Sequence, residues 1–128
     1  MTNDGAKVLL VDDTKDDLEL YFEALPRQRM DVVTASNGSQ ALEKALTCVP
    51  QAIVLDVALP GMDGIEVCRR LKAVERTRRI PVIFLSALSD TRTRERARHV
   101  GAASYLVKPC LPSTLVSEIA TVTQNPSM

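Results

Sequence analysis

The stretch QAIVLDVALPGMDG, residues 51–64, contains an aspartate in an unusual place. Asp56 directly follows the apolar run Ala52–Leu55 and lies four residues before Pro60. A buried carboxylate without a partner costs several kcal/mol of folding free energy or becomes protonated. We therefore expect Asp56 to have either a partner or a chemical role.

Other polar residues follow short apolar runs in the same way. They are Asp12 and Asp13, Ser86, and Lys108, which Pro109 follows. Carboxylates within a few ångström of one another repel, and a divalent cation with oxygen ligands keeps them ionised near neutral pH. A hydroxyl and an ammonium at the same place suit the oxygens of a phosphoryl group. If these residues lie together, they favour a magnesium site that handles phosphoryl groups.

The apolar periodicity predicts the elements that would bring these residues together. Short apolar runs predict strands at 8–11, 31–35, 52–55, 82–85 and 105–107. Apolar residues recur at helical spacing within 18–25, 41–46, 65–71, 92–100 and 111–122. This alternation predicts an α/β fold, a doubly wound parallel sheet with right-handed crossovers and helices on both faces. Ligands of such sheets bind beyond the carboxyl ends of the strands, where the candidate residues lie.

Composition describes a globular chain with an uneven distribution of charge. The length of 128 residues predicts one domain, and the formal net charge of zero argues against nucleic acid or a membrane as partner. Ten of the sixteen basic residues nevertheless lie within 69–98. No apolar run reaches the ~18 residues of a membrane span. The cysteines, three in number and widely spaced, and the single histidine predict neither a disulfide framework nor a zinc site, which favours a reducing cytoplasm.

Four segments together form a recognisable pattern: LLVDD (9–13), VLDVALPGMDGIE (54–66), PVIFLSA (81–87) and GAASYLVKP (101–109). In this order and at this spacing they resemble the CheY-like receiver domain of two-component response regulators. The resemblance covers about residues 7–122 of a single domain, 1–128. It implies a flavodoxin-like sheet of five strands in the order 2-1-3-4-5 with five helices.

The resemblance also implies a role in phosphoryl transfer. Asp56 would accept a phosphoryl group from a histidine kinase or a histidine phosphotransfer protein. Ser86 and Lys108 would contact the phosphoryl oxygens after the transfer. A cis peptide bond before Pro109 would direct the side chain of Lys108 into the site.

A metal site is implied at the same place. Asp12 and Asp13 would hold Mg²⁺, or Mn²⁺, together with Asp56 and the backbone carbonyl of Ala58. The protein would not be an enzyme in the usual sense, because it would catalyse only its own phosphoryl transfer and a slow autodephosphorylation. Ala58 and Leu88 are apolar where the family often has polar side chains, which predicts slow loss of the phosphoryl group.

Phosphorylation would act as a switch in such a protein. The hydroxyl of Ser86 would move toward the phosphoryl group, and Tyr105 would turn inward to fill the space. The surface of the fourth helix, fifth strand and last helix would then bind a downstream protein or a fused output domain. We expect no direct binding of nucleic acid by this domain.

The segment TRTRERARHV, residues 91–100, allows two interpretations. Its arginines alternate by two and would spread around an exposed helix, which favours a solvated surface. As part of the output surface, the same helix would bind an acidic partner with a steep dependence on salt. We also expect Asp63 to cap the third helix, the cysteines to fill apolar space and His99 to lie at a helix end.

Simpler roles and other functions compete with this reading. Asp12 and Asp13 could cap the following helix, Ser86 could be a turn residue, and Lys108 could be a surface charge. A phosphatase of the haloacid dehalogenase type would need a carboxylic acid where Ala58 stands. A flavodoxin-like electron carrier would need a phosphate-binding loop where residues 12–17 are mostly acidic. A receiver fold that binds partners without phosphorylation is the remaining alternative.

Overall fold

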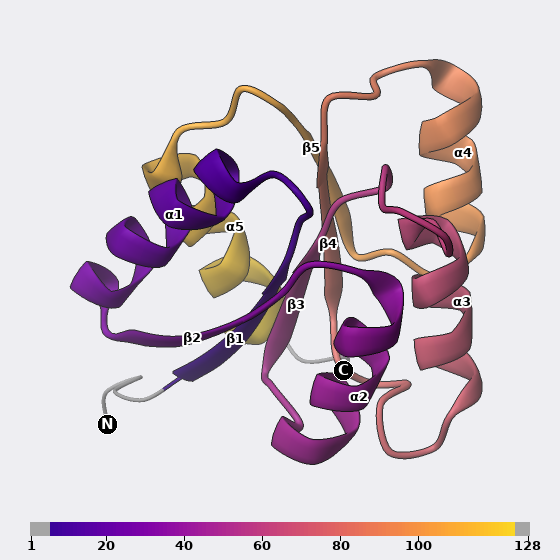
Figure 1. The fold of residues 1–128 in the computed structure, drawn as a ribbon, viewed down its shortest axis with the longest axis horizontal. Coiled ribbons are helices and arrows are strands. Elements are labelled where there is room, and N and C mark those ends of the chain that lie inside the picture. The colour runs from indigo at the N-terminus through magenta and orange to yellow at the C-terminus, as the bar shows by residue number, and fades with distance from the viewer. Residues whose placement is uncertain (1–5, 125–128) are drawn as a thin grey trace.

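The computed structural model describes residues 6–124, with the backbone alone for residues 27, 28 and 124. The strands in this range are β1 (Ala6–Val11), β2 (Met30–Ala35), β3 (Ala52–Leu55), β4 (Val82–Ser86) and β5 (Ser104–Val107). The helices are α1 (Lys15–Ala24), α2 (Gly38–Cys48), α3 (Gly64–Ala73), α4 (Thr91–His99) and α5 (Pro112–Gln124). A 3₁₀ turn, η1 (Leu25–Gln28), follows α1. Strands and helices alternate along the chain (Figure 1).

The strands of the described chain form one parallel sheet in the order β2-β1-β3-β4-β5. The chain starts in β1, adds β2 on one side and then builds β3 to β5 on the other side. Helices α1 and α5 cover one face of the sheet, and α2, α3 and α4 cover the other (Figure 1). The α/β class, the doubly wound arrangement and the strand order are therefore confirmed.

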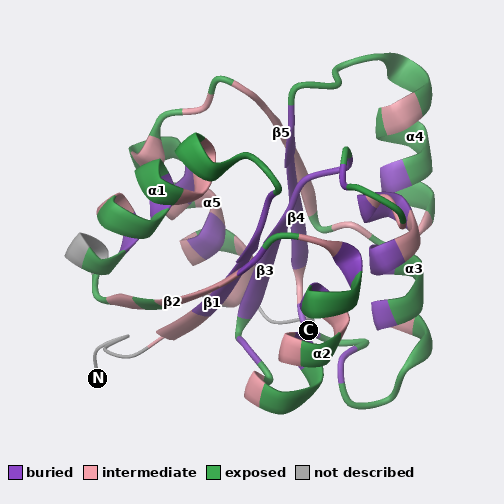
Figure 2. Ribbon diagram, viewed as in Figure 1, coloured by how far each residue is buried: buried purple, intermediate pink, exposed green. Residues whose placement is uncertain are grey.

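Alternating side chains of the inner strands build a core on each face. Along β1, Leu9 and Val11 pack toward α2 and α3, whereas Val8 and Leu10 pack toward α1 and α5. A strand buried on both faces must be apolar at every position. This explains the unbroken apolar run of β3, which is buried along its whole length (Figure 2).

Polar side chains start the helices on one face of the sheet. Each capping side chain accepts a hydrogen bond from the backbone amide three residues later. Asn37 accepts from the amide of Gln40 (2.9 Å), Asp63 from that of Glu66 (2.9 Å) and Asp90 from that of Thr93 (3.0 Å). Such a cap contributes ~1 kcal/mol to stability. The predicted cap at Asp63 is confirmed, and so is the position of His99 at the end of α4.

The first helix differs from the expected boundaries at both ends. Helix α1 begins at Lys15, before its first apolar residue, because its opening turn contains the acidic residues Asp16 and Asp17. Acidic side chains are favourable at the amino end of a helix. Pro26 does not end the helical path but lies in the first turn of η1, where its missing amide is tolerated. No helix among residues 6–124 has the length and apolar character required to cross a bilayer.

Cys68 and Cys110 pack in or against the apolar cores, whereas Cys48 is partly exposed and belongs to neither core. Cys48, Cys68 and Cys110 are free thiols. Cys68 lies in α3 and is fully buried, and this burial raises the pKa of its thiol to about 11. Cys68 therefore remains a neutral thiol at physiological pH and fills apolar space, as the sequence predicts.

Gly64 sets the distance between α3 and the strand end that carries Asp56. Its amide donates to the carbonyl of Val57 at 2.8 Å. A Cβ atom at position 64 would overlap the backbone carbonyl of Asp56. Only glycine lets the first turn of α3 pack this closely against the end of β3.

Replacement of Gly64 with alanine is expected to destabilise the protein by ~2 kcal/mol or more, because α3 or the backbone at Asp56 must move. Gly61→Ala is the matched control, since Gly61 has a φ of +75° but open space around it. Alanine there adds backbone strain of about 1 kcal/mol without a clash. Urea unfolding followed by circular dichroism would compare the two variants. A Gly64→Ala protein as stable as Gly61→Ala would contradict this packing account.

Candidate functional site

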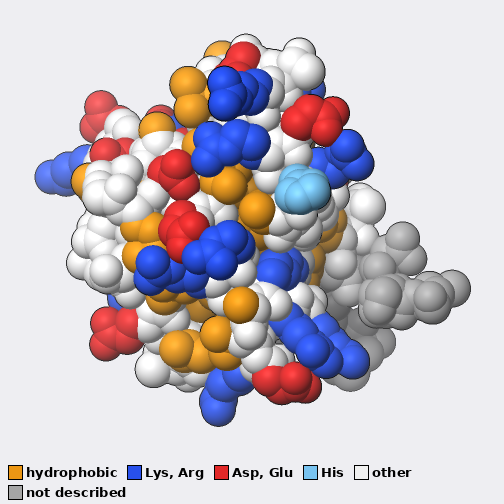
Figure 3. Space-filling view, turned by 90° about the vertical axis from the view of Figure 1, so that its right-hand side faces the viewer, with side chains coloured by type: hydrophobic (Ala, Val, Ile, Leu, Met, Phe, Trp, Pro, Cys, Tyr) orange, Lys and Arg blue, Asp and Glu red, His pale blue; other side chains and the backbone are white. Residues whose placement is uncertain are grey.

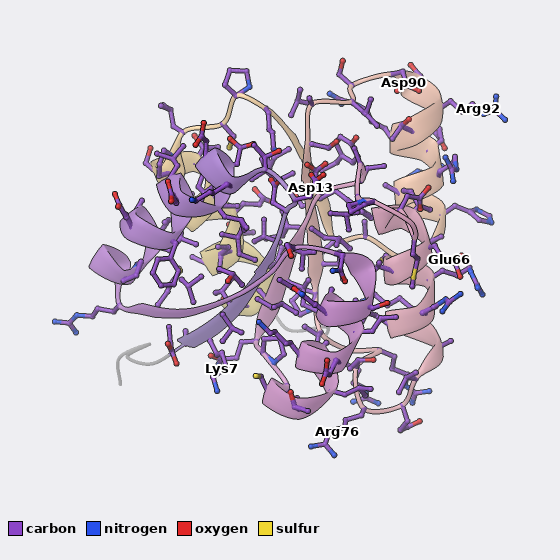
Figure 4. The ribbon with its side chains drawn as sticks, viewed as in Figure 1. Lys7, Asp13, Glu66, Arg76, Asp90 and Arg92 are labelled. Carbon is purple, nitrogen blue, oxygen red and sulfur yellow. The ribbon has the colours of Figure 1, made fainter. Side chains whose placement is uncertain are left out.

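The pairing of the strands brings the candidate residues to one edge of the sheet. The amide of Asp56 donates to the carbonyl of Val11 at 3.0 Å, which aligns the ends of β3 and β1. The amide of Lys108 donates to the carbonyl of Ser86 at 2.9 Å, which aligns the ends of β5 and β4. Figure 4 shows the labelled Asp13 at this same edge. The carboxyl ends of the strands therefore meet where the sequence predicts a site.

The ammonium of Lys108 lies among carboxylates from different elements. Its Nζ donates to Asp12 Oδ2 at 2.7 Å, Asp17 Oδ2 at 2.7 Å and Asp56 Oδ2 at 3.0 Å. The side chain of Lys108 is 15% exposed, and those of Asp12 and Asp56 are 5% and 7% exposed. Lys108 is thus the partner that the buried Asp56 requires, and the interpretation of Lys108 as a surface charge is wrong.

Burial and pairing shift the pKa values of this cluster. Burial lowers the pKa of Lys108, but its hydrogen bonds to Asp12, Asp17 and Asp56 raise the pKa by a larger amount. The pKa of Lys108 is therefore above its ordinary value. Burial raises the pKa of Asp12, and the hydrogen bonds from Lys108 and from the amide of Thr14 lower it by a smaller amount. The pKa of Asp12 is therefore raised overall. Lys108 therefore stays cationic at neutral pH, whereas the negative charge of Asp12 is maintained at a cost. Further positive charge would be favourable here.

The carboxylates also form a group with the chemistry of a metal site. Asp12, Asp13 and Asp56 each offer an oxygen atom, and these atoms lie within 4.8 Å of one another. Asp13 is exposed while the other two are buried, so the group is open to solvent on one side. Oxygen donors and an open side fit Mg²⁺, which keeps several waters when it binds to proteins. The role of the Ala58 carbonyl stays a prediction; its amide donates to Asp56 Oδ1 at 3.1 Å.

Asp12 and Asp13 do not cap α1. The N-cap position of α1 is Thr14, and the Thr14 side chain makes no capping hydrogen bond. Asp12 Oδ1 instead accepts from the amide of Thr14 at 2.9 Å, which fixes the carboxylate outside the helix. The capping interpretation is therefore wrong.

Ser86 and Tyr105 contact the same residue of the loop between β4 and α4. Ser86 is completely buried, and its Oγ accepts from the amide of Leu88 at 3.2 Å. The hydroxyl of Tyr105 donates to the carbonyl of Leu88 at 2.6 Å. The Tyr105 ring packs near Phe84, at a centroid distance of 5.9 Å, and near the guanidinium of Arg94, whose Cζ lies 5.6 Å from the ring centroid. Ser86 is the last residue of β4, so the interpretation as a turn residue is wrong, and its contact with Leu88 links the site to the loop before α4.

Two residues near Lys108 were missed by the sequence analysis. Asp17 binds the ammonium, and the hydroxyl of the buried Tyr21 donates to the carbonyl of Cys110 at 2.6 Å. The peptide bond between Lys108 and Pro109 is cis, as the sequence analysis predicts. The spacing of Asp17 and Tyr21 was the available signal, because residues four apart lie above one another on a helix.

Comparison with known proteins identifies the family. A family model described as the response regulator receiver domain matches residues 8–120. Response regulator PleD of Caulobacter vibrioides is 37% identical over 120 residues, which are 94% of this chain and 26% of PleD. The chain spans about a quarter to a half of the length of the curated relatives that it matches.

Solved structures agree with this match. Chemotaxis protein CheY4 of Vibrio cholerae superposes with a TM-score of 0.87 at 30% identity, over 92% of this chain and 98% of that chain. The receiver domain of sensor histidine kinase PA1611 from Pseudomonas aeruginosa has a TM-score of 0.87 at 29% identity, over 94% of this chain and 98% of that chain. That structure has a magnesium ion coordinated in its active site cleft. The chain described here therefore belongs to the response regulator receiver domains, the signalling modules of two-component systems.

Proposed function

We propose that Asp56 is the phosphoacceptor of this receiver domain. The observation that carries the proposal is the position of Asp56, which accepts from the ammonium of Lys108 and lies beside the carboxylates of Asp12 and Asp13. A carboxylate is a competent nucleophile toward phosphorus when the surrounding charges are balanced. The donor would be a histidine kinase or a histidine phosphotransfer protein.

The transfer forms one bond and breaks another. An oxygen of Asp56 bonds to phosphorus, and the bond between phosphorus and the donor atom breaks, with its electron pair remaining on the donor. The product is an acyl phosphate on Asp56. Lys108 donates to the phosphoryl oxygens, and Ser86 can do so after its hydroxyl turns away from Leu88.

Asp12, Asp13 and Asp56 would hold Mg²⁺, with the carbonyl of Ala58 as a further ligand. When bound, this ion supplies positive charge that offsets the repulsion between the carboxylates and the incoming phosphoryl group. The residues of the chain provide the geometry: the strand ends fix the three carboxylates, and Lys108 remains beside Asp56.

The signal would leave the site through Leu88. Movement of the Ser86 hydroxyl toward the phosphoryl group releases the amide of Leu88, and the inward turn of Tyr105 releases the carbonyl that its hydroxyl binds. The loop before α4 then changes its conformation together with Tyr105. This couples Asp56 to the surface of α4, β5 and α5, which would bind a downstream protein or a fused output domain.

The arginines of α4 give this surface its charge. They contact different neighbours. The guanidinium of Arg94 lies over the Tyr105 ring, Arg96 Nη2 lies 3.9 Å from Asp63 Oδ2, and Arg98 Nη2 lies 2.7 Å from Glu95 Oε1. They therefore spread around the helix, as their spacing predicts. Figure 3 shows Lys and Arg side chains over the face that α3 and α4 form. An acidic partner would suit the part of this surface that belongs to α4.

Incubation with acetyl phosphate and Mg²⁺ is expected to add one phosphoryl group to the protein, measured as intact mass after short incubation. Chelation of the metal should prevent the adduct, because the repulsion at the site is then not offset. Asp56→Asn should remove the adduct. Asp16→Asn, an exposed aspartate of α1, should retain it and serves as the matched control.

The same experiment separates the competing functions. A metal-dependent adduct that Asp56→Asn abolishes supports the proposal. Absence of an adduct at high donor concentration, in a folded protein, would instead favour a receiver fold that binds its partners without phosphorylation.

Tyr105→Ala is expected to uncouple the site from α4, because the mutant lacks both the contact with Leu88 and the ring beside Arg94. Phosphoryl uptake should stay close to that of the wild type, since Tyr105 does not contact Asp56. Amide NMR spectra before and after phosphorylation would measure the effect. The changes at α4 should shrink severalfold in the variant; wild-type changes at α4 would refute this route.

A further inference from the structure

Helix α1 contacts the segment around Lys108 through Asp17 and Tyr21. These residues lie four apart and therefore on the same face of the helix. Asp17 Oδ2 accepts from Lys108 Nζ at 2.7 Å, and the Tyr21 hydroxyl donates to the carbonyl of Cys110 at 2.6 Å. One helix thus holds both the ammonium of Lys108 and the backbone that follows it.

The contacts of Lys108 occupy the donors of its ammonium. An ammonium has three N–H groups, and in residues 6–124 Asp12, Asp17 and Asp56 accept from them. The contact with Asp56, at 3.0 Å, is longer than the contacts with Asp12 and Asp17, at 2.7 Å. A phosphoryl oxygen on Asp56 can bind the ammonium only if an existing contact is shared or given up.

Asp17 differs from the other two acceptors. Asp12 and Asp56 belong to the carboxylate group that fits a divalent cation, and Asp17 is outside that group. The Asp17 side chain is 32% exposed and comes from the first turn of α1, where the helix amides stabilise negative charge. Asp17 therefore acts on Lys108 from outside the group that would hold a metal ion.

We propose that Asp17 is a positioning residue that holds the ammonium of Lys108 toward α1 and thereby slows the phosphorylation of Asp56. The ammonium must give up or weaken its contact with Asp17 before it stabilises the phosphoryl oxygens. Tyr21 keeps the backbone at Cys110 in place, so loss of the Asp17 contact frees the ammonium without displacing the loop. This inference rests on the proposed function of Asp56.

Asp17→Asn and Asp16→Asn form a matched pair for the kinetic test. Both remove one negative charge from the first turn of α1, but Asp16 is exposed and Lys108 donates to Asp17. Uptake of phosphoryl groups from acetyl phosphate should be about fivefold faster in Asp17→Asn than in Asp16→Asn, the effect of weakening one charged hydrogen bond. Asp17→Glu, which keeps the charge, should return the rate toward that of the wild type.

The ammonium of Lys108 gives a second readout that does not require phosphorylation. In ¹⁵N-resolved NMR spectra without a phosphodonor, a held ammonium exchanges its protons slowly and gives an observable signal, which Lys108→Arg would assign by its loss. This signal should persist in Asp16→Asn and weaken strongly in Asp17→Asn.

Each outcome decides a separate point. Faster uptake and a weakened ammonium signal in Asp17→Asn support the inference. A rate equal to or below that of Asp16→Asn, or an unchanged ammonium signal, would overturn it. If the wild-type protein takes up no phosphoryl group, the proposed function and the kinetic effect fail together, whereas the spectrum still decides whether Asp17 holds Lys108.

Discussion

The attraction between the ammonium of Lys108 and the carboxylates around it is the interaction on which this site depends. Asp12 and Asp56 are almost completely buried, and two such charges side by side would repel each other strongly in a poorly solvated place. Lys108, which follows β5, compensates for this repulsion although β5 is separated from β1 by β3 and β4 in the sheet. The ion pairs therefore stabilise the carboxylates and also connect strands that do not pair with each other.

The doubly covered sheet explains why the charges gather at its edge. Inner strands that are buried on both faces accept only apolar side chains along their length, as β3 shows from Ala52 to Leu55. The first polar residue can therefore appear only where the strand ends, and parallel strands all end on the same side. The packing of Gly64 against Asp56 then fixes how closely α3 approaches this edge. The location of the site follows from the architecture of the core.

Leu88 connects the buried site with the surface. Its amide is bound by Ser86, which has no exposed surface, and its carbonyl is bound by Tyr105, which lies on the partly exposed edge strand β5. The loop is thus held through the amide and the carbonyl of Leu88, and a change at Ser86 or at Tyr105 can alter its conformation. Because close-packed cores rearrange between discrete states, the proposed switch would convert a small displacement of Ser86 into a larger change at α4.

The sequence by itself determined the class of fold and the composition of the site. Runs such as Val8–Val11 and helical spacing between them predict alternating strands and helices, and Asp12, Asp56 and Lys108 are visible as polar residues at strand ends. These are local signals. The tertiary structure alone decided which contacts those residues make: Asp12 looks locally like a helix cap, yet it binds a lysine 96 positions away. Asp17 likewise reads as an ordinary acidic residue of a first helical turn. Its contact with Lys108 depends on how α1 packs beside the end of β5, and no local pattern specifies that distance.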